Sequence, residues 1–419
     1  MNRIAELTAW EILDSRGLPT VLTRCRLDDG SEGIASVPSG RSTGAWEAVE
    51  KRDGDPSRYR GAGCLDAVAG VNGEVSAALT GRGLADQAGL DAALVDLDGS
   101  SDKSRLGSNA LLSVSVAYAK AAAQEGGAEL WQYLARQAGN PVPTLPVLTV
   151  NLFSGGKHAG GQVPVQDTLL VAHGAESVAG ALVQIREVFA AAAEITAERY
   201  GERLLTADEG GLAPGFGSVD EMFRCAVDAI DRAGLTREAM ALALDIAASH
   251  FVTESGYRFG GATLDAAEMI ALIDGWVRDF PIVSVEDGLA EDDWGNWPRL
   301  REVLSGRALT VGDDLLCTNP TRIARAVESA AADTLLLKAN QIGTLSEALE
   351  SLQLARAAGW RVVASARSGE TEDSWLADLA VGWSADYIKV GSVTQSERLA
   401  KYNRLLVIEA EAGLQVRGT

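Results

Sequence analysis

Six short apolar runs in the second half of the chain each end in a residue that could take part in chemistry. The residues at these ends are Asp245, Glu286, Asp313, Lys338, Ser365 and Lys389. They are separated by steps of 41, 27, 25, 27 and 24 residues. A step of about 25 residues is the length of one strand–helix unit, and it predicts a β/α barrel. In such barrels the carboxyl ends of the strands form the mouth that carries the active site.

Three of these ends are carboxylates, namely Asp245, Glu286 and Asp313. Hard oxygen ligands on separate rigid strands, with positions left for water and substrate, suit Mg²⁺ better than Zn²⁺. Any one of them alone could be a strand-end charge that faces solvent. Because three share one period, we expect them to form a metal site.

Lys338 follows three consecutive leucines and is one of only seven lysines in the chain. Burial and nearby cations can lower the pKa of a lysine until its amine serves as a base. The alternative is a barrel lysine that is only paired with a carboxylate.

Two glycine-rich segments are candidates for loops over the site. Residues 37–44 combine hydroxyl side chains with glycines and suit a lid that closes on a phosphate or a metal. Residues 207–214 place Glu209 at a sharp turn, where its carboxyl could donate a proton. An ordinary surface loop is the alternative for the first segment, and a purely structural acid is the alternative for Glu209.

The first half of the chain has a different organisation. Residues 10–13 and 21–27 read as strands, with a turn at 28–30, and residues 61–138 read as helical with a long helix over 108–125. Strands followed by helices indicate an α+β domain. We therefore expect an N-terminal α+β domain with a mobile lid over 1–140 and a catalytic β/α barrel over 141–419.

Composition excludes several classes of protein. The 419 residues carry 37 basic and 58 acidic side chains, a formal charge of −21, which argues against nucleic acid or an anionic membrane as a partner. The four cysteines are scattered, which excludes a zinc ribbon and suits a reducing compartment. Neither a signal pattern nor an apolar run of about 18 residues is present, so a soluble cytoplasmic protein is expected.

Taken together, these and further motifs resemble enolase over essentially the whole chain. The matching segments are residues 12–17, 37–44, 52–55, 208–211, 286–288, 291–294, 312–315, 338–343, 367–373 and 397–403. The resemblance implies an α+β capping domain on a barrel of modified strand order, usually as a homodimer. It also implies two Mg²⁺ ions, one held by the three carboxylates named above and the second with help from Ser42 in the lid.

The resemblance further implies a role for each matching site residue. Lys338 would remove the proton next to the carboxylate of a small phosphorylated substrate, 2-phosphoglycerate, in the lysine–Mg²⁺ arrangement of the enolase superfamily. Glu209 would assist departure of the β-hydroxyl, with a second acid at Asp167 and with His158 on a loop over the substrate. Arg367 and Ser368 would contact the phosphate, and Lys389 the carboxylate.

Several positions depart from the family pattern. The family reads His where this chain has Ala366, Glu where it has Asp167, Asn where it has Ser154, and Ala where it has Arg41. A lost site histidine and an added lid arginine predict a changed substrate. We therefore expect a specialised paralogue similar to carboxyphosphonoenolpyruvate synthase, which joins phosphonoformate from a CMP-activated donor to 2-phosphoglycerate.

In that hypothesis Arg41 would meet the added anionic group and Ala366 would make space for it. Two alternatives remain open. One is an ordinary phosphopyruvate hydratase whose sequence has drifted. The other is a catalytically impaired scaffold or binding protein with the same fold.

Overall fold

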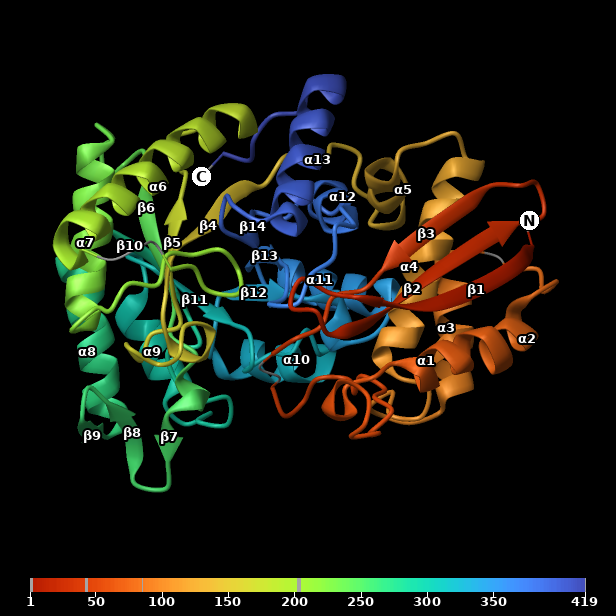
Figure 1. Ribbon diagram of the computed structural model, residues 1–419, viewed down its shortest axis with the longest axis horizontal. Helices are drawn as coiled ribbons and strands as arrows, with labels where there is room; N and C mark the ends of the chain where they lie inside the picture. Colours follow the sequence, from red (N-terminus) through yellow and green to blue (C-terminus); the bar gives the residue numbers. More distant parts are fainter. Residues whose placement is uncertain (1–2, 42–43, 85, 202–204, 419) are drawn as a thin grey trace.

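The computed structural model describes all residues except 1–2, 42–43, 85, 202–204 and 419. Figure 1 shows a three-stranded sheet with its helices on one side of the molecule and a closed barrel on the other. This arrangement confirms the predicted α/β fold class, a β/α barrel with an N-terminal α+β cap. Among the described residues, none of the helices combines the length and the apolar character needed to span a membrane.

The N-terminal part is an antiparallel meander backed by a long helix. Its strands are β1 (Ile4–Leu13), β2 (Pro19–Leu27) and β3 (Glu32–Ser36), and the backing helix is α4 (Ser108–Glu125). The other helices are α1 (Leu65–Gly70), α2 (Ser76–Leu79), α3 (Gln87–Asp98) and α5 (Leu130–Gln137). The predicted long helix over 108–125 is therefore confirmed.

The barrel closes in the order β10-β11-β12-β13-β14-β4-β5-β6. Its strands are β4 (Val147–Ser154), β5 (Asp167–Val171), β6 (Ala241–Asp245), β10 (Ile282–Glu286), β11 (Leu309–Gly312), β12 (Thr334–Leu337), β13 (Arg361–Ser365) and β14 (Tyr387–Gly391). All six predicted strands are present, although β14 continues past Lys389. β5 runs antiparallel to both neighbours, so its first residue, Asp167, lies at the same mouth as the ends of the parallel strands.

The barrel is covered by eight helices within the described residues (Figure 1). They are α6 (Val178–Tyr200), α7 (Val219–Arg232), α8 (Ala266–Asp279), α9 (Trp297–Leu304), α10 (Pro320–Ser329), α11 (Leu345–Ala357), α12 (Trp375–Gly382) and α13 (Ser396–Ala412). The one long step, from Asp245 to Glu286, contains a small extra sheet of β7 (Val252–Thr253), β8 (Gly256–Phe259) and β9 (Ala262–Leu264).

Several contacts fix the cap on the barrel, and two of them bear on the position of the loop over its mouth. α5 of the cap packs on α12 of the barrel, where a Cβ at Gly382 would lie only 2.5 Å from the Trp131 carbonyl oxygen. Ser39 and Gly369 exchange backbone hydrogen bonds of 2.8 and 3.0 Å. The loop that follows Ser39 therefore starts from a fixed point at the barrel mouth.

We predict that Gly382→Ala destabilises the protein by about 1–3 kcal/mol, because the added methyl group overpacks the α5–α12 contact. Gly73→Ala is the matched control, since a Cβ there meets nothing within 4 Å and the residue lies in a helical segment. Urea unfolding of both variants measures the effect. Equal stability of Gly382→Ala and the wild type would show that this contact is not tight.

Candidate active site

A cavity lies at the barrel mouth. It is lined by Arg41, His158, Gln166, Glu209, Asp245, Asp313, Lys338, Ser365, Ala366, Arg367, Ser368 and Lys389. Nearly all the residues singled out in the sequence thus meet at one place. Asp167 and Glu286 lie outside this lining, and Ser42 lies outside the described residues.

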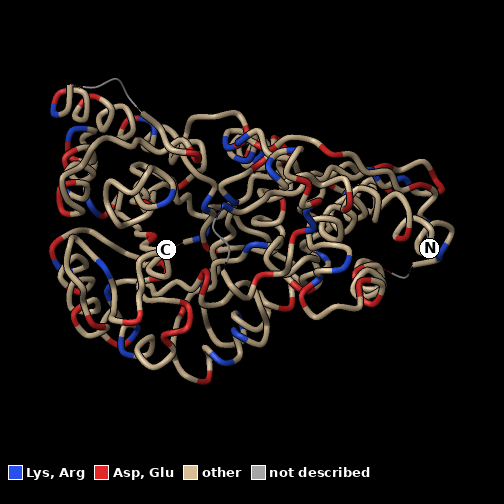
Figure 2. Tube along the Cα trace, turned by 60° about the horizontal axis from the view of Figure 1, so that its bottom comes forward, with Lys and Arg blue, Asp and Glu red and all other residues tan. Residues whose placement is uncertain are grey.

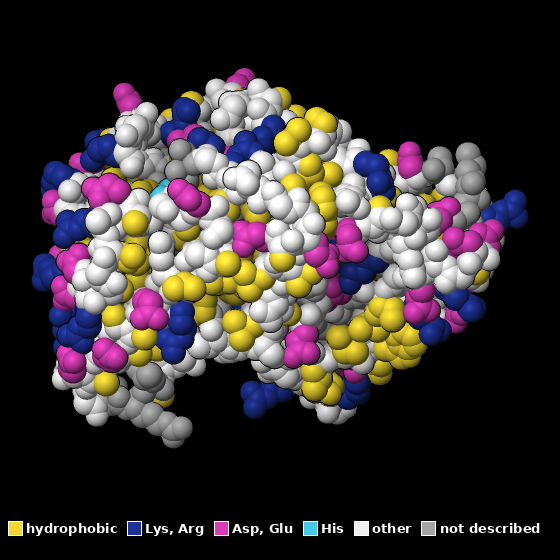
Figure 3. Space-filling model, turned by 90° about the horizontal axis from the view of Figure 1, so that it is seen from above, with side chains coloured by type: hydrophobic (Ala, Val, Ile, Leu, Met, Phe, Trp, Pro, Cys, Tyr) yellow, Lys and Arg dark blue, Asp and Glu magenta, His cyan; other side chains and the backbone are white. Residues whose placement is uncertain are grey.

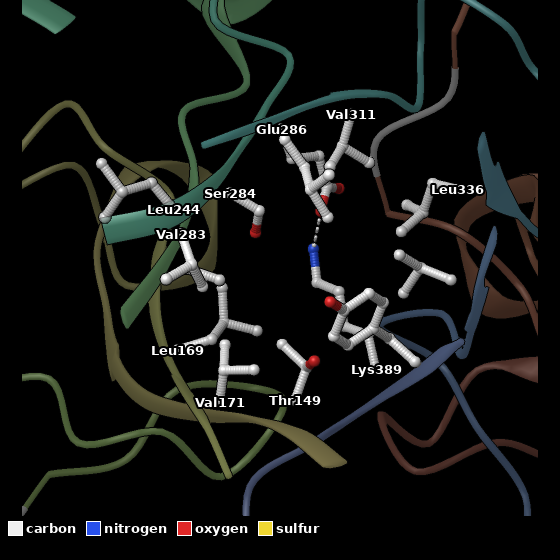
Figure 4. A pocket seen from close by; sticks show the side chains of 14 residues that line it. Thr149, Leu169, Val171, Leu244, Val283, Ser284, Glu286, Val311, Leu336 and Lys389 are labelled. Atoms are coloured by element: carbon white, nitrogen blue, oxygen red, sulfur yellow. Dashed lines mark hydrogen bonds and ion pairs between the residues drawn. The ribbon is translucent and has the colours of Figure 1, made fainter. Parts of the chain in front are cut away.

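The Lys389 ammonium is shared by two carboxylates at the base of the cavity. Its Nζ lies 2.8 Å from Asp245 Oδ2 and 2.7 Å from Glu286 Oε2. Figure 4 shows Lys389 reaching across the barrel interior toward Glu286, with apolar side chains such as Val171 and Leu336 around the space beside them. The three charges are therefore held where little water can solvate them.

Burial and charge together determine the protonation of these groups. Burial raises the pKa of Asp245, but the attraction of Lys389 outweighs it and lowers the pKa to about 2. Burial and repulsion from Asp245 raise the pKa of Glu286 well above its usual value. Two adjacent carboxyl groups thus share a single lysine, so this part of the site can accommodate a further positive charge.

Lys338 is paired with Asp313, with 2.5 Å between Nζ and Oδ2. The other oxygen of Asp313 accepts a hydrogen bond of 2.9 Å from Gln341 Nε2. Burial lowers the pKa of Lys338, but the attraction of Asp313 outweighs burial and raises it. This direction is opposite to the one expected of a base, and its cause is the ion pair.

The carboxylates at the mouth fit a hard cation. Glu286 Oε1 is buried and, within the described part of the chain, has no hydrogen-bond partner. The oxygens of Asp287, Asp313 and Asp314 approach within 4.8 Å of one another, and an acidic group of this kind could hold a metal. Asp245 and Glu286 are not part of that group, so the triad expected from the sequence remains a prediction.

The expected phosphate contacts lie on a braced loop. Arg367 donates hydrogen bonds of 2.9 and 3.1 Å to the two oxygens of Glu47, which belongs to the cap. Ser368 Oγ accepts from the backbone N–H of Arg41 at 2.9 Å. Arg398 donates to the carbonyl oxygens of Arg367 and Ser368 at 2.6 and 2.7 Å. This bracing holds both phosphate-binding candidates at the cavity.

Arg41 and Ala366, the two residues expected from the sequence to set the substrate, both line this cavity. The Arg41 guanidinium forms a half-exposed ion pair of 2.6 Å with Asp208, the neighbour of Glu209 in the chain. Ala366 is 9% exposed and offers only a methyl group at its part of the wall. The lid residue and the Glu209 turn are therefore linked directly.

The remaining wall carries His158, Asp167 and Glu209. One atom of each lies within 4.8 Å of the others. Burial lowers the pKa of His158, but the Asp167 charge and hydrogen bond outweigh it and raise the pKa to about 9. Burial raises the pKa of Glu209, but His158, Arg398 and Lys389 together lower it below its usual value. A protonated imidazole therefore stands beside an ionised Glu209.

Four residues at the site were not assigned a role from the sequence: Glu47, Asn151, Gln166 and Gln341. Gln166 donates to Asp245 Oδ2 at 3.1 Å, and Asn151 donates to Glu209 Oε2 at 3.1 Å. Gln341 stands inside a segment that carries the family resemblance, and Gln166 directly precedes Asp167, a position compared with the family, so an available signal existed for both. Glu47 and Asn151 had no comparable signal, because their partners lie far away in the chain.

Family comparison agrees with this architecture. Residues 4–134 match the enolase N-terminal domain, and residues 142–417 match the enolase C-terminal TIM barrel domain. A capped barrel whose mouth gathers carboxylates, lysines and arginines is the architecture of an enolase-superfamily lyase. The chain belongs to the enolase family.

We predict that His158 stabilises the protein below pH 6.5 and that this contribution is lost as the pH rises through about 9. The sign follows because the pKa of His158 is higher in the folded state than in the unfolded state. The expected loss, on the order of 2 kcal/mol, should disappear in His158→Gln. Urea unfolding of the wild type and of His158→Gln at several pH values from about 6 to about 9, a range that spans the shift, measures this loss.

His250→Gln is the control, because burial lowers the pKa of His250 to about 4 and its contribution changes only at lower pH. It should keep the wild-type loss of stability over the alkaline range. The same loss in His158→Gln as in the wild type would contradict the assignment.

Proposed function

We propose that the protein is an Mg²⁺-dependent lyase that acts on 2-phosphoglycerate and forms an enolpyruvate product. Lys338 removes the α-proton, and the β-hydroxyl departs. The observation that carries the proposal is the single cavity that gathers Lys338, Glu209 and the cations Arg367 and Lys389. The protein would work in the cytoplasm as a homodimer, with a capping domain over 1–140 and a catalytic domain over 141–419.

The base is the first element of the mechanism. Lys338 must lose its proton before it can take one from the substrate. Its ion pair with Asp313 opposes this loss, because it raises the pKa of the amine. Asp313, Asp245 and Glu286 would hold a metal ion, and a carboxylate bound to a metal would no longer serve as the ion-pair partner of Lys338. Its burial then favours the neutral amine.

Two Mg²⁺ ions, the second held with Ser42, would supply positive charge to stabilise the anion that forms when the α-proton leaves. Lys389 would contribute a buried cation on the same side of the cavity. Arg367 and Ser368 would orient the phosphate, with the Arg367 guanidinium shared between the ligand and Glu47.

Departure of the hydroxyl needs a proton. Glu209 is held as a carboxylate by the cations around it, whereas the neighbouring His158 imidazole is protonated. We propose that Glu209 orients the leaving hydroxyl, that the proton of His158 passes to Glu209, and that Glu209 gives it to the hydroxyl, which leaves as water. The pair thus completes the elimination of water that Lys338 begins.

We predict that Lys338→Met lowers the rate of enolpyruvate formation from 2-phosphoglycerate with Mg²⁺ at least about a hundredfold, because the base is lost. Lys51→Met, a lysine away from the cavity, should retain the wild-type rate. The product is followed by its ultraviolet absorbance. A comparable rate in Lys338→Met and Lys51→Met would exclude Lys338 as the base.

A second candidate function is favoured by Arg41 and Ala366, which lie together in the lining of the cavity. An enzyme similar to carboxyphosphonoenolpyruvate synthase must accommodate phosphonoformate from a CMP-activated donor beside 2-phosphoglycerate. Ala366 leaves space at the cavity wall. The Arg41 guanidinium could exchange its exposed partner Asp208 for the added anion.

The two functions are separated by supplying the substrates singly and together. If the second candidate is right, the wild type forms product only when CMP-phosphonoformate is present, and Arg41→Ala loses that activity. Ala366→His should raise any activity on 2-phosphoglycerate alone. Rapid turnover of 2-phosphoglycerate by the wild type would favour the ordinary hydratase. No turnover with either mixture, together with unchanged substrate binding by Lys338→Ala, would favour a scaffold.

A further inference from the structure

We propose that Ser154 and Asp167 are positioning residues that act on the substrate through His158, so that the imidazole and not the Asp167 carboxylate is presented to the cavity. The catalytic part of this inference rests on the proposed lyase function. The structural part stands on the contacts of these three side chains alone.

The first contact joins the two strands that start the barrel. Ser154, the last residue of β4, lies directly opposite Asp167, the first residue of β5, in their antiparallel ladder. Ser154 Oγ donates to Asp167 Oδ1 at 2.6 Å, and neither residue has exposed surface. Because the ladder fixes the distance between the two backbones, the short side chains of Ser154 and Asp167 meet each other and do not extend into the cavity.

The second contact uses the other carboxylate oxygen. Asp167 Oδ2 accepts a hydrogen bond of 3.0 Å from His158 Nδ1–H. Both oxygens of Asp167 are therefore partnered within the wall. Asp167 is absent from the lining of the cavity, whereas His158 belongs to it. With Nδ1 held by Asp167, the imidazole has Nε2 available for the cavity.

The backbone around His158 is held equally firmly. Gly155 N–H donates to Gln166 O at 2.8 Å, and Gly156 N–H donates to Val163 O at 2.9 Å. A Cβ at Gly155 would lie 2.5 Å from both Val163 Cγ2 and Val165 O. The segment before His158 thus packs on the chain that leads into β5, and the imidazole needs only the Asp167 hydrogen bond to set its rotation.

Glu209 gives this orientation a chemical consequence. A nitrogen of His158, an oxygen of Asp167 and an oxygen of Glu209 lie within 4.8 Å of one another. Ser154 also reaches the Glu209 turn, because a Cβ on Gly211 would meet Ser154 Oγ at 2.6 Å. The hydroxyl of Ser154 therefore lies where it can fix the orientation of the Asp167 carboxylate. Through Asp167 it also fixes the orientation of the protonated imidazole beside Glu209.

The first test is spectroscopic and needs no substrate. The chain has only three histidines, so the imidazole nitrogen signals of His158 can be assigned by comparison with His158→Gln. Ser154→Ala and Asp167→Asn should shift the His158 signals. Thr168→Val is the matched control, since the buried hydroxyl of this neighbouring residue on β5 has no partner among the described residues. It should leave the His158 signals unchanged.

The second test is a double-mutant cycle on the enolpyruvate-forming reaction. Ser154→Ala should lower kcat about ten- to a hundredfold, the effect of a hydrogen bond to a charged group, with KM unchanged. In a His158→Gln background neither Ser154→Ala nor Asp167→Asn should lower the rate further, because each acts through the imidazole. A further loss in that background would show that Asp167 contacts the substrate itself and would overturn the proposal.

The two tests also separate this inference from the proposed function. Without lyase activity the imidazole signals still report the Ser154–Asp167–His158 chain, so only the catalytic role would fall. Unchanged His158 signals in Asp167→Asn, with an unfolding midpoint that shows the variant to be folded, would overturn the structural part.

Discussion

The ion pairs of Lys389 are the interaction on which the site depends. Asp245 and Glu286 lie side by side on β6 and β10, and Lys389 reaches them from β14 across the barrel (Figure 4). Buried charges are tolerated only when they are paired with good geometry. Closure of the barrel supplies that pairing, because it brings strands far apart in the chain to one mouth. The site therefore requires the closed sheet.

The same principle places the net charge of −21 in context. Acidic and basic residues are interspersed along the chain and over the face of the molecule seen from above (Figures 2 and 3). The acids expected to bind the metal lie at the barrel mouth: Asp245 and Glu286 are buried beside Lys389, and Asp313 is partly buried beside Lys338. An acidic protein can thus hold cations locally. In low-dielectric surroundings each of these cations interacts more strongly with an anion than a charge on the surface does.

Much of the fold was predictable, because one strand–helix unit has a characteristic length and six polar residues repeat at that spacing. The antiparallel strand β5 was not, since its short run begins rather than ends with its polar residue, Asp167. At the site, groups carried on strand ends and family motifs could be identified. The Arg367–Glu47 and Ser154–Asp167 pairs could not, because the first joins the cap to the barrel and the second depends on strand register.

The departures from the family pattern are not spread evenly around the cavity. Lys338 and the carboxylates expected to hold the metal keep the family residue types, so the groups for removing the α-proton are intact. Ser154 and Asp167 both depart from the family pattern and are in contact with each other. Arg41 and Ala366 line the cavity where the phosphate and the leaving group are expected. The groups expected to remove the α-proton therefore keep the family residue types, whereas the departures fall on groups expected to act on what leaves or replaces the hydroxyl.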